Sequence, residues 1–294
     1  MNGILVVDKP QGFTSFDVVA KMRGICRTKK IGHGGTLDPM ATGVLPVFVG
    51  PAVKAVDLQP QQDKEYEAEV LFGVATDTGD LTGEVVQTSV FEIERVALEK
   101  AAESFLGTRQ QLPPMYSAVK VRGKPLYRYA REGEKVERKP RTVTFHQIEI
   151  LGEAGAGRWR LRVRCSKGAY IRVLAEELGQ ALGGCATLAA LRRTAAGVFT
   201  LGDAYRLEQV QKAKDEDSLQ RLFVPTERVF ESLPSLSVTE EEKKRLLHGA
   251  AVHGRRDRAG RYRVKQQEEF LGLGIVDEEG SLQVEKLFVE RDGS

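Results

Sequence analysis

The most constraining feature of the sequence is residues 31–50, where a glycine-rich loop holds one carboxylate and then runs into an apolar strand. The glycines have no Cβ, so the backbone there can adopt positive φ and lie close against a ligand. Pro39 disfavours the α region for Asp38 and so favours an extended backbone at the acid. By residue type alone, an Asp-Pro pair most often marks only the start of a turn. Taken as a whole, the string indicates that Asp38 is the residue that carries the chemistry and that the loop presents its side chain outward.

The charge of the chain is unevenly distributed. The 294 residues suffice for one large and one small domain, and the net charge of +3 is mild. Residues 116–146, however, contain nine Lys or Arg against three Glu, whereas residues 57–110 lean acidic. Such segregation favours a surface that faces phosphates, with a solvated charged loop as the alternative. Because the basic segment has few apolar residues, we interpret it as an arm that becomes ordered on a nucleic acid.

The cysteines and histidines argue against a disulfide framework and against a metal site. Cys26, Cys165 and Cys185 are odd in number, widely spaced and without a Cys-x-x-Cys pair, which indicates small buried side chains in a reducing compartment. The four histidines show no metal-ligand spacing. No stretch approaches the ~18 apolar residues of a membrane span, and no basic segment followed by a long apolar run opens the chain. We therefore expect a cytoplasmic protein that does not enter the membrane.

The N-terminal part predicts a strand and a capped helix. Residues 4–7 are apolar and are followed by a turn that contains Pro and Gly, which is typical of a strand end. Thr14 or Ser15 then supplies a helix cap, with Asp17 in a weaker form of the capping box. This helix brings basic side chains to the edge of the glycine-rich loop, so a polyanion would meet positive charge first. These side chains are Lys21, Arg23, Arg27, Lys29 and Lys30.

The next stretch predicts a strand, a hairpin and a helix. Residues 84–87 follow a turn-rich run and indicate the second strand of a hairpin with an elaborated turn. Its first strand alternates with period two and places on one face Tyr66, Ala68, Val70 and Phe72. Residues 93–106 are expected to form an amphipathic helix that ends at Gly107. Its apolar face uses Val96, Ala101, Ala102 and Phe105.

Arginines alternate with apolar residues in residues 158–165. As a strand, this segment would bury one face and direct four guanidinium groups outward. Because four like charges repel one another, they should face either a ligand or interleaved acids. Tyr170 and Arg172 would share a face if the strand persisted that far. A helix is expected over residues 173–182, and residues 188–193 lead into another short element.

From about residue 235 the chain predicts a small, mostly β unit. A helix is expected to begin near Thr239. Short strands should follow at residues 262–264, 270–276 and 282–288, with a turn at residues 277–280. A unit of about sixty residues is close to the lower practical size for an independent fold.

Several stretches closely resemble the TruB family of tRNA pseudouridine synthases, in order and with family-like spacing. The most specific is the string Gly-His-x-Gly-x-Leu-Asp-Pro, which begins at Gly32 and contains Asp38. The resemblance covers roughly residues 1–230, and the C-terminal part is similar, much more loosely, to a PUA-type RNA-binding domain. The matching stretches are residues 3–15, 30–45, 64–66, 113–120 and 165–172.

The resemblance implies an α+β fold. A mixed, largely antiparallel central sheet flanked by helices should be followed by a small, mostly β, PUA-like domain. The catalytic domain would then comprise residues 1–234, with a basic RNA-binding arm at about residues 116–146. The PUA-like domain would comprise residues 235–294.

The resemblance also implies an activity. The family converts the uridine at position 55, in the T loop of tRNA, to pseudouridine without a metal or organic cofactor, and Asp38 corresponds to its catalytic aspartate. The base must be flipped out of the RNA, and the closed site must keep water away from the sugar intermediate. A glycosidase would need a second carboxylate. The partner would be the tRNA T stem-loop, bound by a monomer. The sequence leaves open whether Asp38 attacks C1′, attacks the uracil ring or removes a ribose proton.

Further residues take roles from the resemblance. Tyr66 resembles the tyrosine that packs on the flipped uracil, although the alternation alone favours a strand core residue. Arg172 resembles the arginine that pairs with the catalytic aspartate, which should lower the pKa of Asp38. Tyr170 and Leu191 resemble residues that line the pocket, and for Leu191 a plain core role is equally open. The lysines and arginines among the expected RNA contacts would bind phosphates. The expected contacts are His33, Lys54, Lys120, Arg138, Lys139 and Arg141.

Two other functions compete with this one. An RNA chaperone or RNA-binding module would share the basic surfaces and use Asp38 only structurally. A base-hydrolysing glycosidase would release free uracil and leave an abasic RNA. A phosphate-binding P-loop is disfavoured because no Gly-Lys-Ser/Thr follows the glycines.

Overall fold

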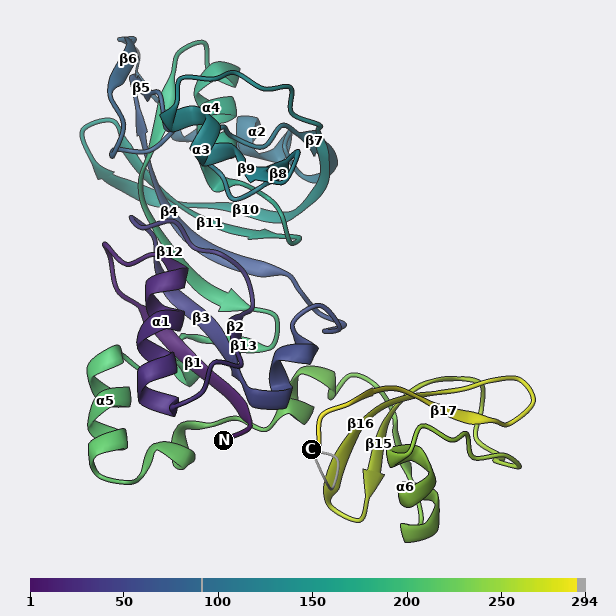
Figure 1. The fold of residues 1–294 in the computed structure, drawn as a ribbon. Helices are drawn as coiled ribbons and strands as arrows, with labels where there is room; N and C mark the ends of the chain where they lie inside the picture. Colours follow the sequence, from purple (N-terminus) through teal and green to yellow (C-terminus); the bar gives the residue numbers. More distant parts are fainter. Residues whose placement is uncertain (91, 290–294) are drawn as a thin grey trace.

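Figure 1 shows the fold of the computed structural model, which describes residues 1–90 and 92–289. Its larger sheet has nine strands: β1 (Gly3–Lys9), β2 (Ile31–His33), β3 (Thr42–Val49), β4 (Lys64–Phe72), β7 (Gly107–Gln111), β10 (Arg141–Gly155), β11 (Arg158–Cys165), β12 (Ala186–Ala196) and β13 (Phe199–Thr200). The main order is β1-β3-β12-β4-β11-β10-β7, with β2 paired to β3 and β13 to β12. All pairs are antiparallel except β12 with β3. The α+β class expected from the sequence is confirmed.

Helices accompany both ends of this sheet. α1 (Ser15–Cys26) and α5 (Leu207–Asp215) lie beside β1 and β3, as Figure 1 shows. At the other end, α2 (Arg95–Glu103) packs against β10 and α4 (Ile171–Ala181) packs against β12. In the part of the chain that the structure describes, no helix is long and apolar enough to cross a membrane. Shorter elements are η1 (Gly50–Ala55), β5 (Val74–Thr76), β6 (Val85–Thr88), β8 (Lys120–Val121), β9 (Lys124–Pro125), α3 (Leu126–Arg131), η2 (Leu201–Asp203), η3 (Leu219–Leu222) and η4 (Thr226–Phe230).

The first strand and helix form as predicted. The hydroxyl of Thr14 accepts a hydrogen bond from the Asp17 N–H at 3.0 Å, and the Asp17 carboxylate accepts one from the Thr14 N–H at 2.8 Å. This reciprocal pair satisfies two N–H groups that the first helical turn leaves free. The strand β1 is buried on both faces: Leu5 packs in the cluster that α1 covers, and Ile4 packs in the cluster on the opposite face.

The arginine-rich strand faces interleaved acids rather than a ligand. In the register between β11 and β4, Glu67 lies opposite Arg162. Arg162 is 3.6 Å from Glu67 and 3.0 Å from Glu149, and Arg158 is 2.7 Å from Glu69. The opposite face is apolar on both strands, as the alternation predicts, and its buried members include Tyr66, Ala68, Val70, Phe72, Trp159, Leu161, Val163 and Cys165.

Three predicted details are wrong. Strand β6 pairs with β5 and not with β4, because Gly73, at φ +90°, separates β5 from β4. The helix α2 begins two residues later than expected, and it leaves Val96 72% exposed and buries Leu98 instead. Residues 188–193 belong to the eleven-residue strand β12 and not to a short element. Because β11 ends at Cys165 and Arg172 lies in the first turn of α4, the condition for Tyr170 and Arg172 to share a strand face is not met.

The basic segment 116–146 is more ordered than an arm that folds only on RNA. It contains the hairpin β8–β9 and the helix α3, and its last residues belong to β10. Leu126 of α3 is fully buried and Tyr129 nearly so. The Tyr129 hydroxyl donates a hydrogen bond to the Val121 carbonyl at 3.2 Å. The interpretation of this segment as an arm that becomes ordered only on a nucleic acid is therefore wrong, because a few well-placed apolar residues suffice to pack it.

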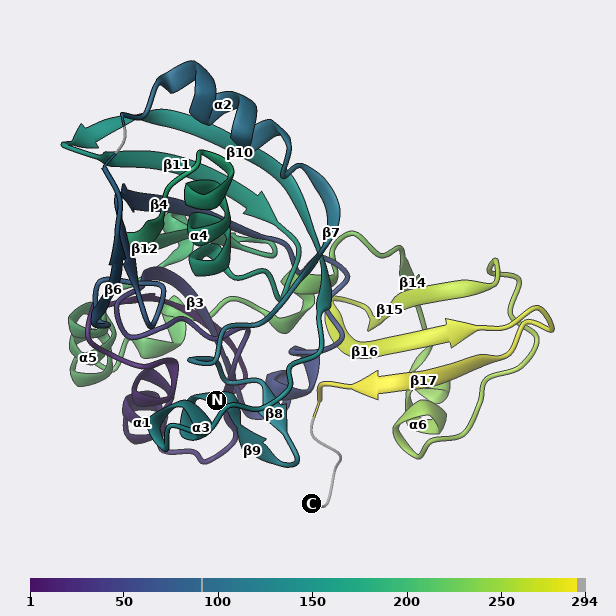
Figure 2. The same cartoon turned by 90° about the horizontal axis from the view of Figure 1, so that it is seen from above.

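The C-terminal part forms a second sheet, in the order β14 (Ser235–Ser237), β15 (Gly260–Gln266), β16 (Glu269–Val276) and β17 (Leu282–Leu287), with α6 (Glu240–Leu247). Thr239 caps α6 as predicted, and the three predicted strands form. Figure 2 shows this sheet extending away from the larger one. The two parts meet where the rings of Phe270 and Phe288 lie 6.1 and 5.5 Å from that of Phe230. Residues 290–294 of the expected PUA-like domain lie outside the described residues.

Candidate active site

A cavity of about 480 Å³ lies where the glycine-rich loop meets the middle of the larger sheet. The loop contributes residues 34–38, and β4 and β12 contribute Tyr66 and Leu191. The opposite side comes from the basic segment and from the turn that leads into α4. Five separate parts of the sequence therefore surround one space. Its lining includes five of the predicted side chains of the site, namely Asp38, Tyr66, Tyr170, Arg172 and Leu191.

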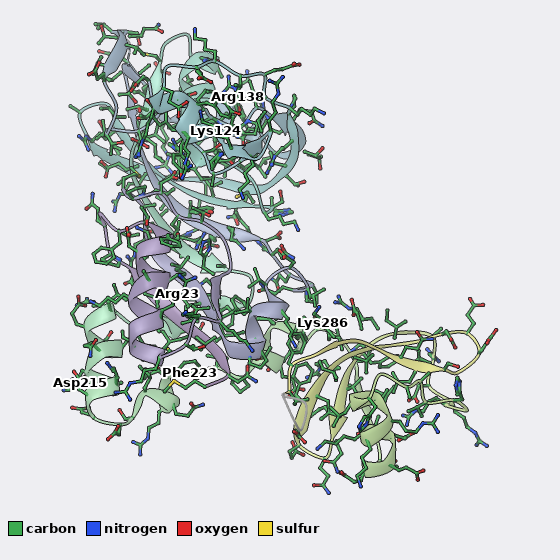
Figure 3. All side chains as sticks on the ribbon, viewed as in Figure 1. Arg23, Lys124, Arg138, Asp215, Phe223 and Lys286 are labelled. Atoms are coloured by element: carbon green, nitrogen blue, oxygen red, sulfur yellow. The ribbon has the colours of Figure 1, made fainter. Side chains whose placement is uncertain are left out.

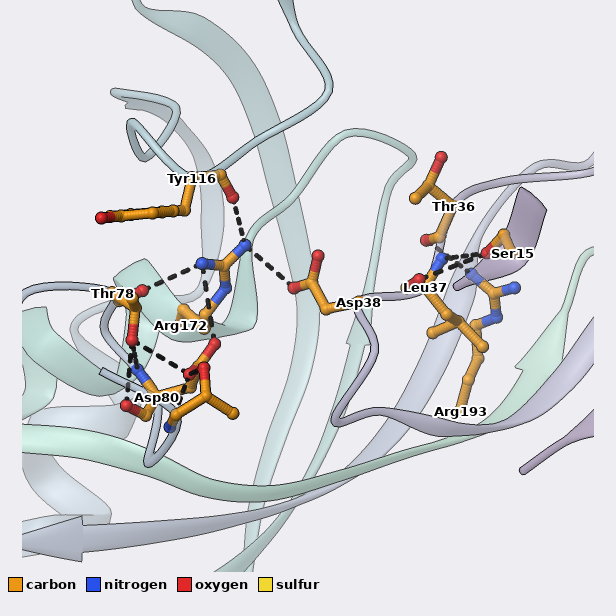
Figure 4. Close-up of polar contacts among 10 residues, drawn as sticks. Ser15, Thr36, Leu37, Asp38, Thr78, Asp80, Tyr116, Arg172 and Arg193 are labelled. Atoms are coloured by element: carbon orange, nitrogen blue, oxygen red, sulfur yellow. Dashed lines mark hydrogen bonds and ion pairs between the residues drawn. The ribbon is translucent and has the colours of Figure 1, made fainter. Parts of the chain in front are cut away.

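The centre of the cavity is an ion pair between Asp38 and Arg172 (Figure 4). A guanidinium nitrogen of Arg172 lies 2.9 Å from the Asp38 carboxylate, and the other lies 3.7 Å from Asp80. The carbonyls of Thr78 and Tyr116 accept two more hydrogen bonds from Arg172, at 2.9 and 2.8 Å. The Arg172 side chain is 4% exposed, whereas that of Asp38 is 34% exposed. Arg172 is thus fixed from several sides, while one face of Asp38 stays open to the cavity.

Burial raises the pKa of Asp38, and this effect is larger than the opposing effect of Arg172. The neighbouring carboxylate of Asp80 also raises the pKa, whereas Lys9 lowers it. The expectation of a net lowering is therefore wrong, although Arg172 acts in the expected direction. Partial removal from water destabilises the charged carboxylate, and this makes Asp38 more reactive as a base or nucleophile.

The backbone around Asp38 is held by buried side chains. The Leu37 N–H donates to the Ser15 hydroxyl at 2.8 Å, and this hydroxyl donates to the Leu37 carbonyl at 3.2 Å. Arg193, 1% exposed, donates to the carbonyls of Gly35 and Thr36 at 3.0 and 3.4 Å. These contacts fix the residues on the N-terminal side of the acid (Figure 4).

Lys9 fixes the other side of the acid. Its ammonium donates to the carbonyls of Phe13, Pro10 and Pro39 at 2.6, 3.0 and 3.4 Å. The side chain is fully buried, and burial lowers the pKa of Lys9 to about 8. Because Pro39 follows Asp38 directly, the buried ammonium of Lys9 lies close to Asp38, but in the described chain the two do not form an ion pair.

Two tyrosines form part of the cavity wall, Tyr66 buried and Tyr170 half-buried. Tyr66 is 7% exposed; burial raises the pKa of its phenol, and the adjacent Arg193 opposes this shift. Burial also raises the pKa of Tyr170, with Ser117 opposing. The backbone of Tyr170 is held by Gln111, which accepts from its N–H at 2.7 Å and donates to its carbonyl at 3.1 Å. Leu191, 9% exposed, is both a core residue and a lining residue, so its two predicted roles do not exclude each other.

The predicted RNA contacts divide into two groups. Lys120 and Arg141 line the cavity. His33 lies beside it, where its Nδ1 accepts from the Gly35 N–H at 3.3 Å, and burial with the charge of Arg193 lowers the pKa of His33. Lys54 instead donates to the Leu287 carbonyl of the C-terminal sheet at 3.2 Å. Arg138 and Lys139 lie outside the cavity, on the basic segment, where Figure 3 labels Lys124 and Arg138. Arg138 donates to the Pro113 carbonyl at 2.9 Å.

Sequence reasoning missed Asp80, Arg193 and Lys64. Asp80 belongs to the run Thr-Asp-Thr-Gly-Asp-Leu-Thr, in which Thr78 and the Thr82 N–H donate to its carboxylate, both at 3.0 Å. The threonines around this acid are a signal for a hydrogen-bonded turn, but nothing local connects that turn to Arg172. Arg193 and Lys64 each stand in a strand, and only the fold brings them to the cavity.

The arrangement suits chemistry on a planar base with a single reactive carboxylate. Asp38 faces the cavity, tyrosine and leucine side chains provide flat and apolar walls, and Arg172 keeps the acid in place. Among the described residues, no group of three His, Cys, Asp or Glu side chains is placed to hold a metal ion.

Family profiles cover most of the chain. The profile described as "TruB family pseudouridylate synthase (N terminal domain)" matches residues 23–171. A "tRNA pseudouridylate synthase B C-terminal domain" matches residues 172–231, and "Pseudouridine synthase II TruB, C-terminal" matches residues 234–288.

Relatives and solved structures agree with these profiles. A tRNA pseudouridine synthase B of Pseudomonas putida is 42% identical over 292 residues, which covers 98% of this chain and 95% of the relative. One of Bacillus licheniformis is 43% identical and covers 85% of this chain and 83% of the relative. A chain in the crystal structure of a Cbf5-Nop10-Gar1 complex is similar with a TM-score of 0.74 at 28% identity, covering 99% of this chain and 86% of that one. A chain of an H/ACA RNP bound to a substrate RNA containing 2′-deoxyuridine gives a TM-score of 0.73 at 25% identity, with 99% and 86% covered.

Proposed function

The chain belongs to the TruB family of pseudouridine synthases, and from this premise we propose that it isomerises the uridine at position 55, in the T loop of tRNA, to pseudouridine. Relatives named tRNA pseudouridine synthase B match nearly the whole chain. The observation that carries the proposal is the position of Asp38. This residue of the family signature faces the cavity and lies 2.9 Å from a buried arginine.

In the proposed reaction, the N1–C1′ bond of the flipped uridine breaks and a C5–C1′ bond forms. The proton on C5 leaves and N1 gains one, so the product is an isomer of the substrate and no co-reactant is consumed. Asp38 is the catalytic residue. Tyr66 and Tyr170 pack against the base, Leu191 completes the wall, and Arg172 positions Asp38.

The geometry supports an isomerase over a glycosidase. A glycosidase uses two carboxyl groups that both reach the substrate. Here the second acid, Asp80, is 6% exposed and lies against the far nitrogen of Arg172 at 3.7 Å. Its carboxylate also accepts hydrogen bonds from Thr78 and Thr82. Asp80 therefore serves to hold Arg172, and of the two acids that line the cavity, Asp38 and Asp57, Asp38 is the one paired with this arginine.

The proposed partner is the tRNA T stem-loop, bound by a monomer in the cytoplasm. Lys120 and Arg141 at the cavity, together with Arg138 and Lys139 outside it, would contact phosphates, which makes binding salt-dependent. His33 would enter the T loop beside the flipped nucleotide. Lys54, which bonds to the C-terminal sheet, would contact phosphate through its remaining N–H groups. We place the catalytic domain at residues 1–234 and the PUA-like domain at residues 235–294.

The test is incubation of the protein with a transcribed tRNA followed by mapping of pseudouridine. We expect modification at position 55 without a change in RNA mass, and no modification of a control tRNA that carries cytidine there. Free uracil and an abasic site would support a glycosidase. Binding without any modification would support an RNA-binding module, and either result would contradict the proposal.

A further inference from the structure

Lys64 is a cavity residue to which the proposed reaction gives no role. It is the first residue of β4, two before Tyr66, and it lines the same cavity as Asp38. Its ammonium donates to the Gln62 carbonyl at 2.8 Å and, within the described chain, has no carboxylate partner. An ammonium has three N–H groups, so donors remain for a ligand.

A comparison with Lys9 shows why this is unusual. Burial lowers the pKa of both lysines to about 8. Lys9 is fully buried, and three backbone carbonyls satisfy its ammonium. Lys64 has one such carbonyl and borders the cavity. A desolvated cation with unused donors costs free energy in the free protein. The ammonium of Lys9 therefore has its hydrogen-bond partners without a ligand, whereas the ammonium of Lys64 still has unused donors.

The surroundings of Lys64 are positively charged. A Cβ added to Gly35 would lie 3.4 Å from Cε of Lys64 and 3.6 Å from a guanidinium nitrogen of Arg193, so both side chains lie over the same point of the catalytic loop. The charges of Arg193 and Lys167 both lower the pKa of Lys64. The nearby acid Asp63 pairs with His146 at 3.1 Å, and burial raises the pKa of the Cys165 thiol to about 12, so that it stays neutral.

Of these cations, the two lysines are free to bind a ligand. Arg193 donates to the carbonyls of Val44, Gly35 and Thr36. Lys167 also lines the cavity, is exposed, and makes no ion pair in the part of the chain that the structure describes. Uracil is uncharged and gives no reason for a pair of cations. A flipped nucleotide, however, brings the phosphates on either side of it to the mouth of the pocket.

We propose that Lys64 and Lys167 form an anion subsite that binds a backbone phosphate next to the flipped uridine. The inference rests on the proposed function, because it takes the substrate to be an RNA. The subsite lies on the β4 side of the cavity, beside Gly35, and holds the nucleotide by its backbone while the base turns. Lys64 is the half-buried, fixed half of the subsite, and Lys167 is the exposed half.

The experiment combines protein variants with RNAs that lack one charge. T stem-loop RNAs are made with a methylphosphonate, a neutral replacement, at each phosphate around the target in turn. Binding to the wild type, Lys64→Met and Lys167→Gln is measured, with Lys100→Gln, an exposed lysine of α2 outside the cavity, as control. With normal RNA we expect Lys64→Met to weaken binding roughly 10- to 100-fold, the value of a charge-assisted hydrogen bond, and the control to have no effect.

The decisive result is the coupling between protein and RNA. At one phosphate position, the methylphosphonate should weaken binding to the wild type and not weaken it further for Lys64→Met. Equal effects of Lys64→Met on the charged and neutral RNAs at every position would overturn the subsite. Wild-type protein that forms no pseudouridine on the normal RNA would instead refute the proposed function, so the two failures can be told apart.

A pH series gives an independent readout. Because the pKa of Lys64 is about 8 in the free protein, the wild type should lose RNA affinity as the pH rises from 7 through 9. The Lys64→Arg variant keeps its charge over this pH range, so its RNA affinity should depend less on pH than that of the wild type. The dependence that remains would come from Lys9 and the other titratable groups. Identical pH profiles for the two proteins would contradict the role of Lys64, and they would do so even if Lys64→Met failed to fold.

Discussion

Two irregular segments border the same cavity and are held in opposite ways. The loop of residues 34–39 is fixed by the buried side chains of Ser15, Lys9 and Arg193, each of which bonds to its backbone. The part of the basic segment that precedes β10, residues 116–140, is held mainly by its own hairpin and helix and by exposed contacts such as the Lys124–Glu132 ion pair. Exposed ion pairs contribute little to stability.

The difference matches what each segment has to do. Catalysis requires reacting groups within about 0.5 Å of the productive geometry, so the loop that carries Asp38 must be rigid before the substrate arrives. Phosphate binding depends on charge that acts over about 8 Å in physiological salt and tolerates displacement. Substitutions in the loop should therefore change the rate of reaction, and substitutions in the basic segment should change RNA affinity.

The largest expected effect is that of Asp38→Asn. The side chain keeps its shape but loses the negative charge and the ability to act as base or nucleophile, so pseudouridine formation should be abolished while RNA binding persists. Single-turnover assays with a T stem-loop, together with a binding measurement, check this. A rate near that of the wild type would show that Asp38 has no chemical role.

The next effect is that of Arg172→Met, which removes the buried partner of Asp38 and Asp80. It leaves two carboxylates without their counter-ion, so the free energy of unfolding should fall by about 3–5 kcal/mol and the reaction rate should fall with it. Urea denaturation and single-turnover rates measure the two effects. Arg160→Met, on the exposed face of β11, is the matched control and should change the stability by less than about 0.5 kcal/mol. Equal effects of the two substitutions would mean that the loop does not depend on Arg172.

The sequence predicts well those features that depend on neighbours along the chain. The cap of α1 needs only Thr14 and Asp17, three residues apart, and the alternation from Tyr66 to Phe72 directly gives the buried face of β4. The family signature likewise singles out Asp38. In each case the physical cause lies within a few residues.

Features that depend on tertiary contacts could not be predicted in this way. Whether the arginines of β11 face a ligand or acids is decided by the pairing of β11 with β4. A signal was present, because Glu65, Glu67 and Glu69 alternate with the same period of two as the arginines. The link from Asp80 to Arg172 joins residues far apart in the sequence. The direction of the pKa shift of Asp38 depends on how deeply the fold buries it, which charge pairing alone does not reveal.

A smaller effect is expected in the basic segment, from the triple variant Arg138→Gln, Lys139→Gln and Arg141→Gln. Each lost phosphate contact removes about one from the slope of log affinity against log salt, so the slope should flatten by about two to three, and affinity should fall roughly 10- to 100-fold. The rate constant at saturating RNA should change little. Titrations between low and high salt test this, with Lys212→Gln and Lys214→Gln on α5 as control. An unchanged slope would show that the segment does not contact phosphates.

The smallest effects come from one glycine in each segment, and they separate rigidity from stability. Gly35 has φ +125°, and an added Cβ would lie 3.4 Å from Lys64 and 3.6 Å from Arg193. Gly133 has φ +71°, with open space where its Cβ would be. Alanine should cost about 1–2 kcal/mol of stability at either position because of the strained φ. Only Gly35→Ala should also slow the reaction, since it disturbs the backbone that carries Asp38. Equal rates for the two variants in single-turnover assays would mean that the catalytic loop tolerates displacement as well as the basic segment does.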